Sequence, residues 1–149
     1  MSPKQFTRTI ILLLIGAVGL SVLFKPIENY LITLVARVAF LILTPVKGVS
    51  LVDGTIYGNG ISVEVVYLCT PAPVFGLVVA YFALTWRGLK DLILLPVSFL
   101  IMALFDGLRI AVMFVLLEHN CSMFIAHDVT AYASFLAAIG FILFIREKT

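Results

Sequence analysis

Three side chains that together could perform nucleophilic chemistry stand far apart in an otherwise apolar sequence: Cys69, Arg109 and His127. A thiol is a weak nucleophile until it loses its proton, and a nearby cation or a helix N-terminus favours the thiolate. Arginine offers fixed hydrogen-bond donors to a developing oxyanion or to a carboxylate. Histidine can take a proton and return it to a leaving amine. These residue types predict acyl transfer through a thioester, provided that the fold brings them together.

Each of the three residues also has a structural explanation. A single cysteine in an apolar segment usually packs as a small hydrophobic residue. Arg109 can pair with Asp106, because residues at positions i and i+3 share a helix face. An ionisable residue inside a membrane span is nevertheless a functional candidate by default. His127 can equally be a loop histidine, and the sequence alone leaves both explanations open.

Other polar residues give further alternatives. His119 and Cys121 in the segment LEHNCSMF form a rival pair. Cys121 and Cys69 would join in a disulfide in an oxidising compartment. Arg37 stands in the middle of the apolar run 30–46, and we expect it to be a buried structural or substrate-guiding residue that pairs with a carboxylate. The spacing lacks the ligand set of a zinc site, so we expect no metal and no cofactor.

The composition sets the environment in which this chemistry would occur. Of 149 residues, 62% are hydrophobic and only 12% are charged, and the mean hydropathy is +1.18. A soluble domain of this length carries about twice that share of charged residues, so the chain is predicted to be an integral membrane protein. The net charge of +2 and the lack of a basic stripe argue against nucleic-acid binding. The basic and then apolar N-terminus is interpreted as a retained anchor rather than a cleaved signal.

The apolar runs predict the membrane-spanning elements. A spanning helix needs about 20 apolar residues, and five segments qualify: 9–24, 30–46, 68–86, 92–117 and 129–145. The first two are short and are joined by KPIEN, which suggests a tight helical hairpin. We therefore expect an all-α polytopic membrane protein of about five transmembrane helices, forming one membrane domain over residues 1–149.

The connection 47–67 differs in character from the helices that flank it. It contains the turn pairs Asp53-Gly54 and Asn59-Gly60 among β-branched residues, which is typical of a short β-hairpin. Ile61, Val63 and Val65 alternate with more polar residues, so one face should lie against the membrane or the helices. Unpaired strands cannot lie in lipid, so this hairpin is predicted outside the membrane, between spans two and three.

Basic residues in short loops indicate which ends of the spans face the cytoplasm. The loop Arg87–Lys90 and the tail Arg146–Lys148 are the best such signals, and Lys25 is predicted on the same side. Five spans then place the N-terminus, with Lys4 and Arg8, on the outside, against the usual charge rule.

This orientation brings the three candidate residues to one layer. Cys69 opens span three at the outer face. Arg109 lies 18 residues after Asp91, hence about 27 Å along span four, near the outer face again. His127 precedes span five and is also outside. The predicted site is therefore extracytoplasmic.

At these residues the sequence resembles the exosortase/archaeosortase family of membrane cysteine transpeptidases. The matching segments are ISVEVVYLCTPAPVFGL with Cys69, LPVSFLIMALFDGLRIAVMFVLL with Arg109, and AHDVTAYASFLAAIGFILF with His127. Their order and hydropathy agree over residues 48–145. The chain departs from the family in Thr70–Pro73, which replaces Ser-Gly, and in Asp106, where Asn is frequent. It is also shorter than the eight-span bacterial members and is similar to the compact end of the family.

The resemblance implies a role for each matching residue. Cys69 would be the nucleophile, Arg109 the oxyanion or substrate clamp, and His127 the acid/base, with Thr70 adding a hydroxyl near the thiol. The implied substrates are membrane-anchored proteins with a C-terminal sorting signal of a short motif, a transmembrane helix and a basic tail. Cleavage would occur at the outer face of the cell membrane, with hydrolysis or transfer to a lipid or glycan acceptor.

Two other function classes are compatible with the sequence. The chain could be a non-enzymatic small integral membrane partner or subunit of an export or assembly machine, with Cys69 as packing and Asp106–Arg109 as a structural pair. A small transporter built around Arg37, Asp106 and Arg109 is a weaker alternative, because the sequence shows no paired repeat.

Overall fold

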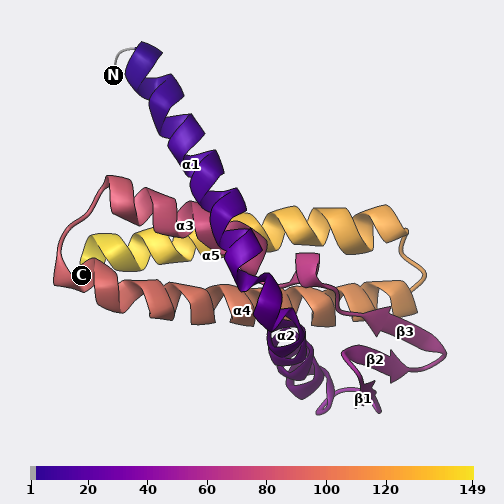
Figure 1. The fold of residues 1–149 in the computed structure, drawn as a ribbon. Helices are drawn as coiled ribbons and strands as arrows, with labels where there is room; N and C mark the ends of the chain where they lie inside the picture. Colours follow the sequence, from indigo (N-terminus) through magenta and orange to yellow (C-terminus); the bar gives the residue numbers. More distant parts are fainter. Residues whose placement is uncertain (1–2) are drawn as a thin grey trace.

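The computed structural model describes residues 3–149, with side chains from residue 7 onward, and is 76% helical with one small sheet (Figure 1). The elements are, in chain order, α1 (Pro3–Phe24), the 3₁₀ turn η1 (Lys25–Ile27), α2 (Glu28–Leu43), β1 (Ser50–Val52), β2 (Thr55–Gly58), β3 (Ile61–Glu64), the 3₁₀ turn η2 (Tyr67–Cys69), α3 (Ala72–Leu84), α4 (Leu89–Glu118), the π-helical segment η3 (Phe124–Val129) and α5 (Thr130–Lys148).

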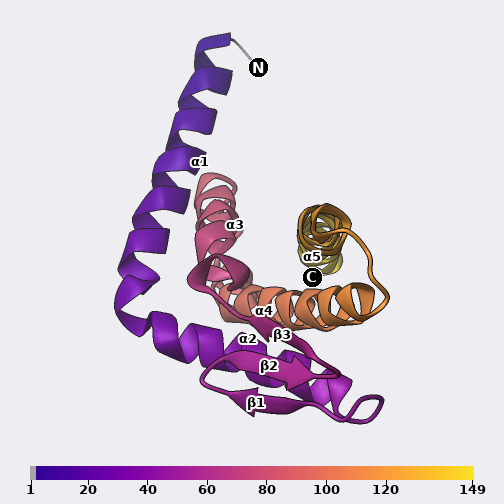
Figure 2. The ribbon, with the colours of Figure 1, turned by 90° about the vertical axis from the view of Figure 1, so that its right-hand side faces the viewer.

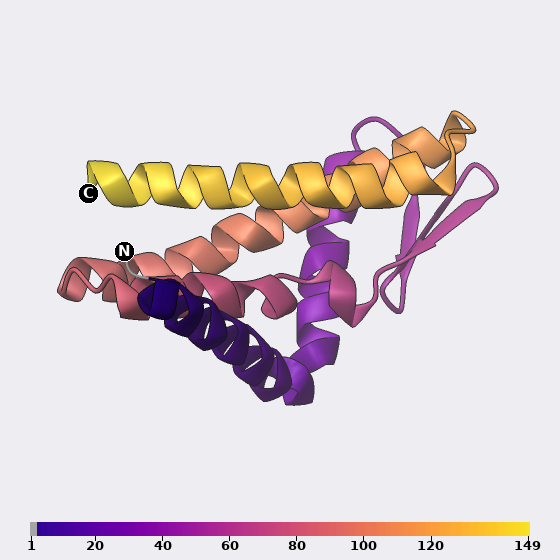
Figure 3. The ribbon, with the colours of Figure 1, turned by 90° about the horizontal axis from the view of Figure 1, so that it is seen from above.

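The helices are arranged around the long helix α4. Helix α5 runs antiparallel beside it, and α3 joins the two at the end where the chain terminates (Figures 1 and 3). Helix α1 packs on α3, whereas α2 lies across α4 and beside the sheet. Figure 2 looks nearly along α4 and shows α3, α4 and α5 as three sides of a U, with α1 outside α3.

Three helical stretches are long and apolar enough to cross a membrane: 7–43, Leu89–Glu118 and Phe124–Lys148. The expected five spans are therefore confirmed only in part. Helix α3 has 13 residues, too few for a span by itself. The spans predicted at 92–117 and 129–145 match α4 and α5 within a few residues.

The predicted helical hairpin of 9–24 and 30–46 is wrong. The chain bends at η1, where Pro26 removes a backbone donor, and α2 then leads away from α1 (Figure 2). The two helices have different partners, because α1 packs on α3 and α2 packs on α4. Apolarity predicted the two helices, and their partners decided the angle between them.

The connection 47–67 forms a three-stranded antiparallel sheet in the order β1-β2-β3, which is two hairpins rather than one. Both predicted turn pairs adopt left-handed conformations, with φ of 47° and 79° at Asp53-Gly54 and of 50° and 77° at Asn59-Gly60. These values suit the two-residue turns that match strand twist. Val63 and Val65 are buried while Ser62, Glu64 and Val66 are exposed, so the predicted alternation is confirmed.

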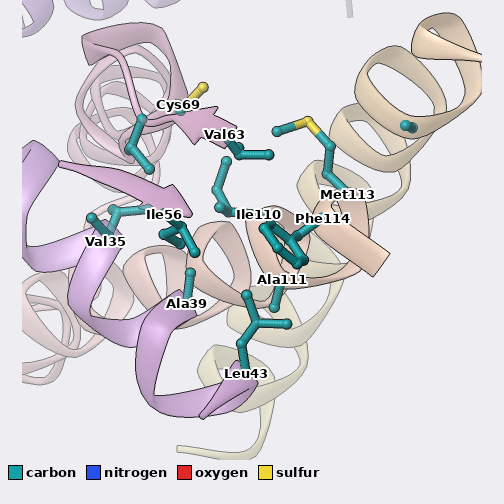
Figure 4. Packing of buried hydrophobic residues seen from close by; sticks show 13 residues of the cluster. Val35, Ala39, Leu43, Ile56, Val63, Cys69, Ile110, Ala111, Met113 and Phe114 are labelled. Carbon is teal, nitrogen blue, oxygen red and sulfur yellow. The ribbon is translucent and has the colours of Figure 1, made fainter. Parts of the chain in front are cut away.

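A hydrophobic cluster joins α2, the sheet and the second half of α4 (Figure 4). Its centre consists of fully buried aliphatic and aromatic side chains, including Val35, Ile56, Ile110 and Phe114. A second cluster joins α3, the first half of α4 and α5 around Phe82 and Met102. Glycine permits the closest approach between α1 and α3, since a Cβ at Gly76 would lie only 2.4 Å from the Cα atom of Ala17. Small residues of this kind are typical of helix contacts in membranes.

A buried ion pair closes the end of the bundle opposite the sheet. Arg146 donates from Nε to Asp91 Oδ1 at 2.9 Å and from Nη2 to Asp91 Oδ2 at 2.8 Å. Arg146 also donates to Thr85 Oγ1 and to the Thr85 carbonyl oxygen, each at 2.7 Å. Arg87 donates to the carbonyl oxygen of Arg146 at 3.3 Å. The two basic segments at 87–90 and 146–148 therefore lie at the same end, as predicted.

Lys25 lies elsewhere, and its predicted place beside those segments is wrong. Its Nζ atom lies 4.9 Å from the ring centroid of Tyr67, in the turn that carries Cys69. Helix α1 runs antiparallel to α3, because Ser21 contacts Tyr67 at one end of α3 while Leu13 shares a cavity with Tyr81 at the other.

Replacing Arg146 with Ala should lower the unfolding free energy by about 3–5 kcal/mol, because the Asp91 carboxylate would stay buried without its partner. Thermal unfolding in detergent measures the loss. The control is Lys148→Ala, an exposed cation in the same last turn, which should leave the melting temperature unchanged. Equal melting temperatures for Arg146→Ala and the unaltered protein would contradict a stabilising ion pair.

Candidate functional site

Cys69 ends the turn η2, three residues before α3 begins. Its thiol is free and only 4% of the residue is exposed. It lies at the edge of the cluster beneath the sheet, near Val63 (Figure 4). Pro71 is the N-cap of α3 and Pro73 lies in its first turn, positions where the missing N–H costs little. The prolines therefore fix the start of α3, as expected.

Thr70 is buried and connects this turn to the neighbouring cavity. Its hydroxyl donates to the Tyr67 carbonyl oxygen at 2.7 Å, so it stabilises the turn that carries the cysteine. The Tyr67 hydroxyl in turn donates to the Ser21 carbonyl oxygen of α1 at 2.5 Å. The first bond closes the turn that carries Cys69, and the second joins this turn to α1.

A cavity of about 260 Å³ lies between α3, α4 and α5. Thr70, just before α3, and Asp106 and Arg109 of α4 are among its polar lining residues. The remaining lining residues are Leu68, Val74, Met102, Ala131, Tyr132, Ser134, Phe135 and Ala138. The Nη2 atom of Arg109 is buried and makes no hydrogen bond to any described residue. A buried guanidinium nitrogen normally has a partner, so this donor is available to a group that enters the cavity.

The explanation of Arg109 as the structural partner of Asp106 is not supported. Among residues 3–149, no ion pair within 4.0 Å joins the two side chains, although they share the cavity and interact electrostatically. Both groups therefore face the same space without neutralising each other by direct contact.

His127 lies in the π-helical segment η3, directly before α5. Its Nδ1 atom lies 2.7 Å from the Asp128 Oδ1 atom. Ala126, the residue before it, is buried in the same cluster as Cys69 and Ile110. Ile110, the neighbour of Arg109, belongs to the same cluster. Neither Cys69 nor His127 lines the cavity that Arg109 borders, so a site shared by the three side chains stays a prediction. Single π-helical turns frequently occur at functional sites.

Asp128 is a candidate that the sequence reasoning missed. A carboxylate on one ring nitrogen of a histidine fixes the tautomer and leaves the other nitrogen free for proton transfer. The signal available in the sequence was the acidic residue next to His127. It was uninformative by itself, because adjacent side chains on a regular helix point in different directions.

Arg37 is exposed on the outer face of α2, so its predicted burial in mid-span is wrong. The buried stripe of α2 turns toward α4 and the sheet, and Arg37 lies on the other side. His119 is exposed, with Nδ1 2.8 Å from the Val115 carbonyl oxygen. Cys121 is free and half-buried, so no disulfide joins it to Cys69. The described residues contain no group of three or more His, Cys, Asp or Glu arranged to hold a metal ion.

Comparisons with known proteins found no relative of this chain. No protein-family model matches the chain, and no curated protein or solved structure matches it. The resemblance to the exosortase/archaeosortase family therefore rests on the three motifs around Cys69, Arg109 and His127.

The burial of the two cysteines predicts different reactivity. A membrane-impermeant maleimide should label Cys121 faster than Cys69 by about tenfold or more, because the buried thiol reacts only after local opening. The measurement is the labelling rate of the Cys69→Ser and Cys121→Ser variants in proteoliposomes. The rate should persist in Cys69→Ser, which keeps Cys121, and fall in Cys121→Ser, which keeps Cys69. Similar rates in both variants would contradict the shielding of Cys69.

Proposed function

We propose that this protein is an exosortase-like intramembrane cysteine transpeptidase or protease that cleaves the C-terminal sorting signals of secreted proteins. The observation that carries the proposal is the unpartnered, buried Nη2 donor of Arg109, a residue that lines a cavity together with Thr70, the residue after Cys69. A placed donor without a protein acceptor is what an oxyanion or a substrate carboxylate requires.

The chemistry assigns one step to each side chain. His127 takes the proton of the Cys69 thiol, and the thiolate attacks the scissile carbonyl carbon. Arg109 donates hydrogen bonds to the oxyanion of the tetrahedral intermediate. The intermediate collapses with cleavage of the C–N bond, and His127 returns the proton to the leaving amine. Water or an outer lipid or glycan nucleophile then attacks the thioester and releases the thiol.

The space between α3 and α5 suits a substrate that is itself anchored in the membrane. A second cavity of about 250 Å³ lies between α1, α3 and α5 and is lined only by apolar residues and one tyrosine. Its lining residues are Leu13, Leu77, Val78, Tyr81, Phe82, Ile139, Ile142 and Leu143. An apolar substrate helix could diffuse within the bilayer and lie along this side, with its cleavage motif at Arg109.

The location follows from the same arrangement. Three apolar helical stretches are compatible with a multi-pass membrane protein. With the basic segments at 87–90 and 146–148 on the cytoplasmic side, the end that carries Cys69, Arg109 and the sheet faces the extracytoplasmic side of the cell membrane.

One observation favours a non-enzymatic alternative. Cys69 is 4% exposed and belongs to a hydrophobic cluster, as a packing residue would. On this alternative the chain is a small membrane partner or subunit of an export or assembly machine, and the cavity has no reactive role.

Substitution of Cys69 and Arg109 distinguishes the two functions. The variant Arg109→Met removes the guanidinium but keeps the apolar stem. Because Nη2 has no protein partner, we expect the melting temperature to change little while processing of the sorting substrate stops. Cys69→Ala should also leave the substrate full-length, and the control Cys121→Ala should process it normally.

The measurement uses cells that express the chain together with secreted proteins that share one C-terminal motif, an apolar helix and a basic tail. Mass spectrometry then identifies the C-termini of these secreted proteins. Unchanged processing by a well-folded Cys69→Ala variant would exclude the thiol mechanism and favour the non-enzymatic alternative.

The contact between His127 and Asp128 predicts a graded loss of rate. His127→Ala should lower kcat by about 10²–10⁴-fold, the usual contribution of a general acid or base. Asp128→Asn should lower kcat by a smaller factor and leave KM unchanged, because the carboxylate orients the ring without touching the substrate. Asp128→Glu should restore part of the rate. A rise in KM without a fall in kcat would contradict the positioning role of Asp128.

A further inference from the structure

Helix α2 has an unusual position for such an apolar helix. The chain changes direction at η1, and α2 runs crosswise to α4 and α5 (Figure 3). It packs on the second half of α4 and on the sheet. An apolar helix that crosses the bilayer would instead run along its neighbours.

The contact point on α4 gives the depth of α2. A Cβ atom at Gly107 would lie 2.3 Å from Val38, so the two helices cross at this glycine. Gly107 lies 16 residues after Asp91, which is about 24 Å along the helix. The hydrocarbon core is about 30 Å thick. If the Asp91–Arg146 ion pair marks one boundary, α2 lies close to the opposite boundary and the sheet lies beyond it.

The two faces of α2 differ in chemistry. One face is a buried stripe packed on α4 and the sheet, consisting of Leu31, Val35, Ala36, Ala39 and Leu43. The opposite face carries Tyr30 and Leu41, which are 78% and 68% exposed, with Thr33 and Arg37 between them. Tyrosine and arginine favour the membrane–water boundary, where a ring or an aliphatic stem meets lipid and the polar tip meets headgroups.

We propose that α2 is an interfacial helix whose outer face binds the phospholipid headgroup layer on the side of the sheet. Arg37 makes no ion pair with any described residue, so its cation is available to lipid phosphate. Lys25 and Lys47, at the two ends of this surface, are each paired with a glutamate, so Arg37 supplies its unpaired positive charge. The occupant is thus a layer of anionic phosphate groups above acyl chains.

This position of α2 changes the number of crossings. Without α2, the helices left to cross are α1, α4 and α5, because α3 with its 13 residues is too short for a span by itself.

Depth-dependent fluorescence quenching tests the proposal in the full chain, reconstituted in liposomes with nitroxide-labelled lipids. In a Trp86→Phe background, single tryptophans replace Tyr30 or Leu41. These exposed positions are 11 residues apart, about 16 Å along the helix. We expect both tryptophans to be quenched most by labels near the headgroups and to lie at the same depth.

The matched control places tryptophan at Ile93 or Leu104, which are also exposed and 11 residues apart, but on α4. These two should differ in depth by about 16 Å. A difference of that size between positions 30 and 41 would overturn the proposal and show that α2 crosses the membrane. A second exposed pair, Thr33→Trp and Thr44→Trp, repeats the comparison if either first variant fails to fold.

Discussion

The bidentate contact between Asp91 and Arg146 holds one end of the molecule at a fixed level. Two charges in an apolar environment are stable only when paired and fully hydrogen-bonded, and the remaining donors of Arg146 meet this requirement at Thr85. The pair thereby joins the end of α3, the start of α4 and the end of α5. Because helices have a constant rise per residue, this junction also sets where Thr70 and Arg109 meet at the other end of the bundle.

Local sequence signals predicted the features that depend on local physics. The apolar run 92–117 corresponds to α4, and the Asp-Gly and Asn-Gly pairs form the turns whose left-handed conformations they favour. The layer of candidate residues also followed from counting, because helix rise relates position in the chain to depth. Cys69 and the chain neighbours of Arg109 and His127 belong to one buried cluster, whereas the meeting of the three side chains and their catalytic roles stay predictions.

Features that depend on distant contacts could not be predicted in this way. Hydropathy measures how apolar a helix is and contains no information about its direction, so α2 was expected to span and Arg37 to be buried. Gly107 provides the close approach that places α2 across α4, and its role appears only once Val38 is seen beside it. The contact of Asp128 with His127 lies within η3, whose π-helical geometry the residue pattern does not predict.

That π-helical segment has a consequence for how the chain can tolerate change in length. A π-turn holds one more residue than an α-turn, so deleting one residue within Phe124–Val129 would let an ordinary α-helix continue without a break. The side chains before the deletion would then rotate by about 100° relative to α5. A deletion at Val129, after His127, would turn the ring away from its present direction although His127 and Asp128 both remained. The segment is therefore constrained in its number of residues as well as in their identity.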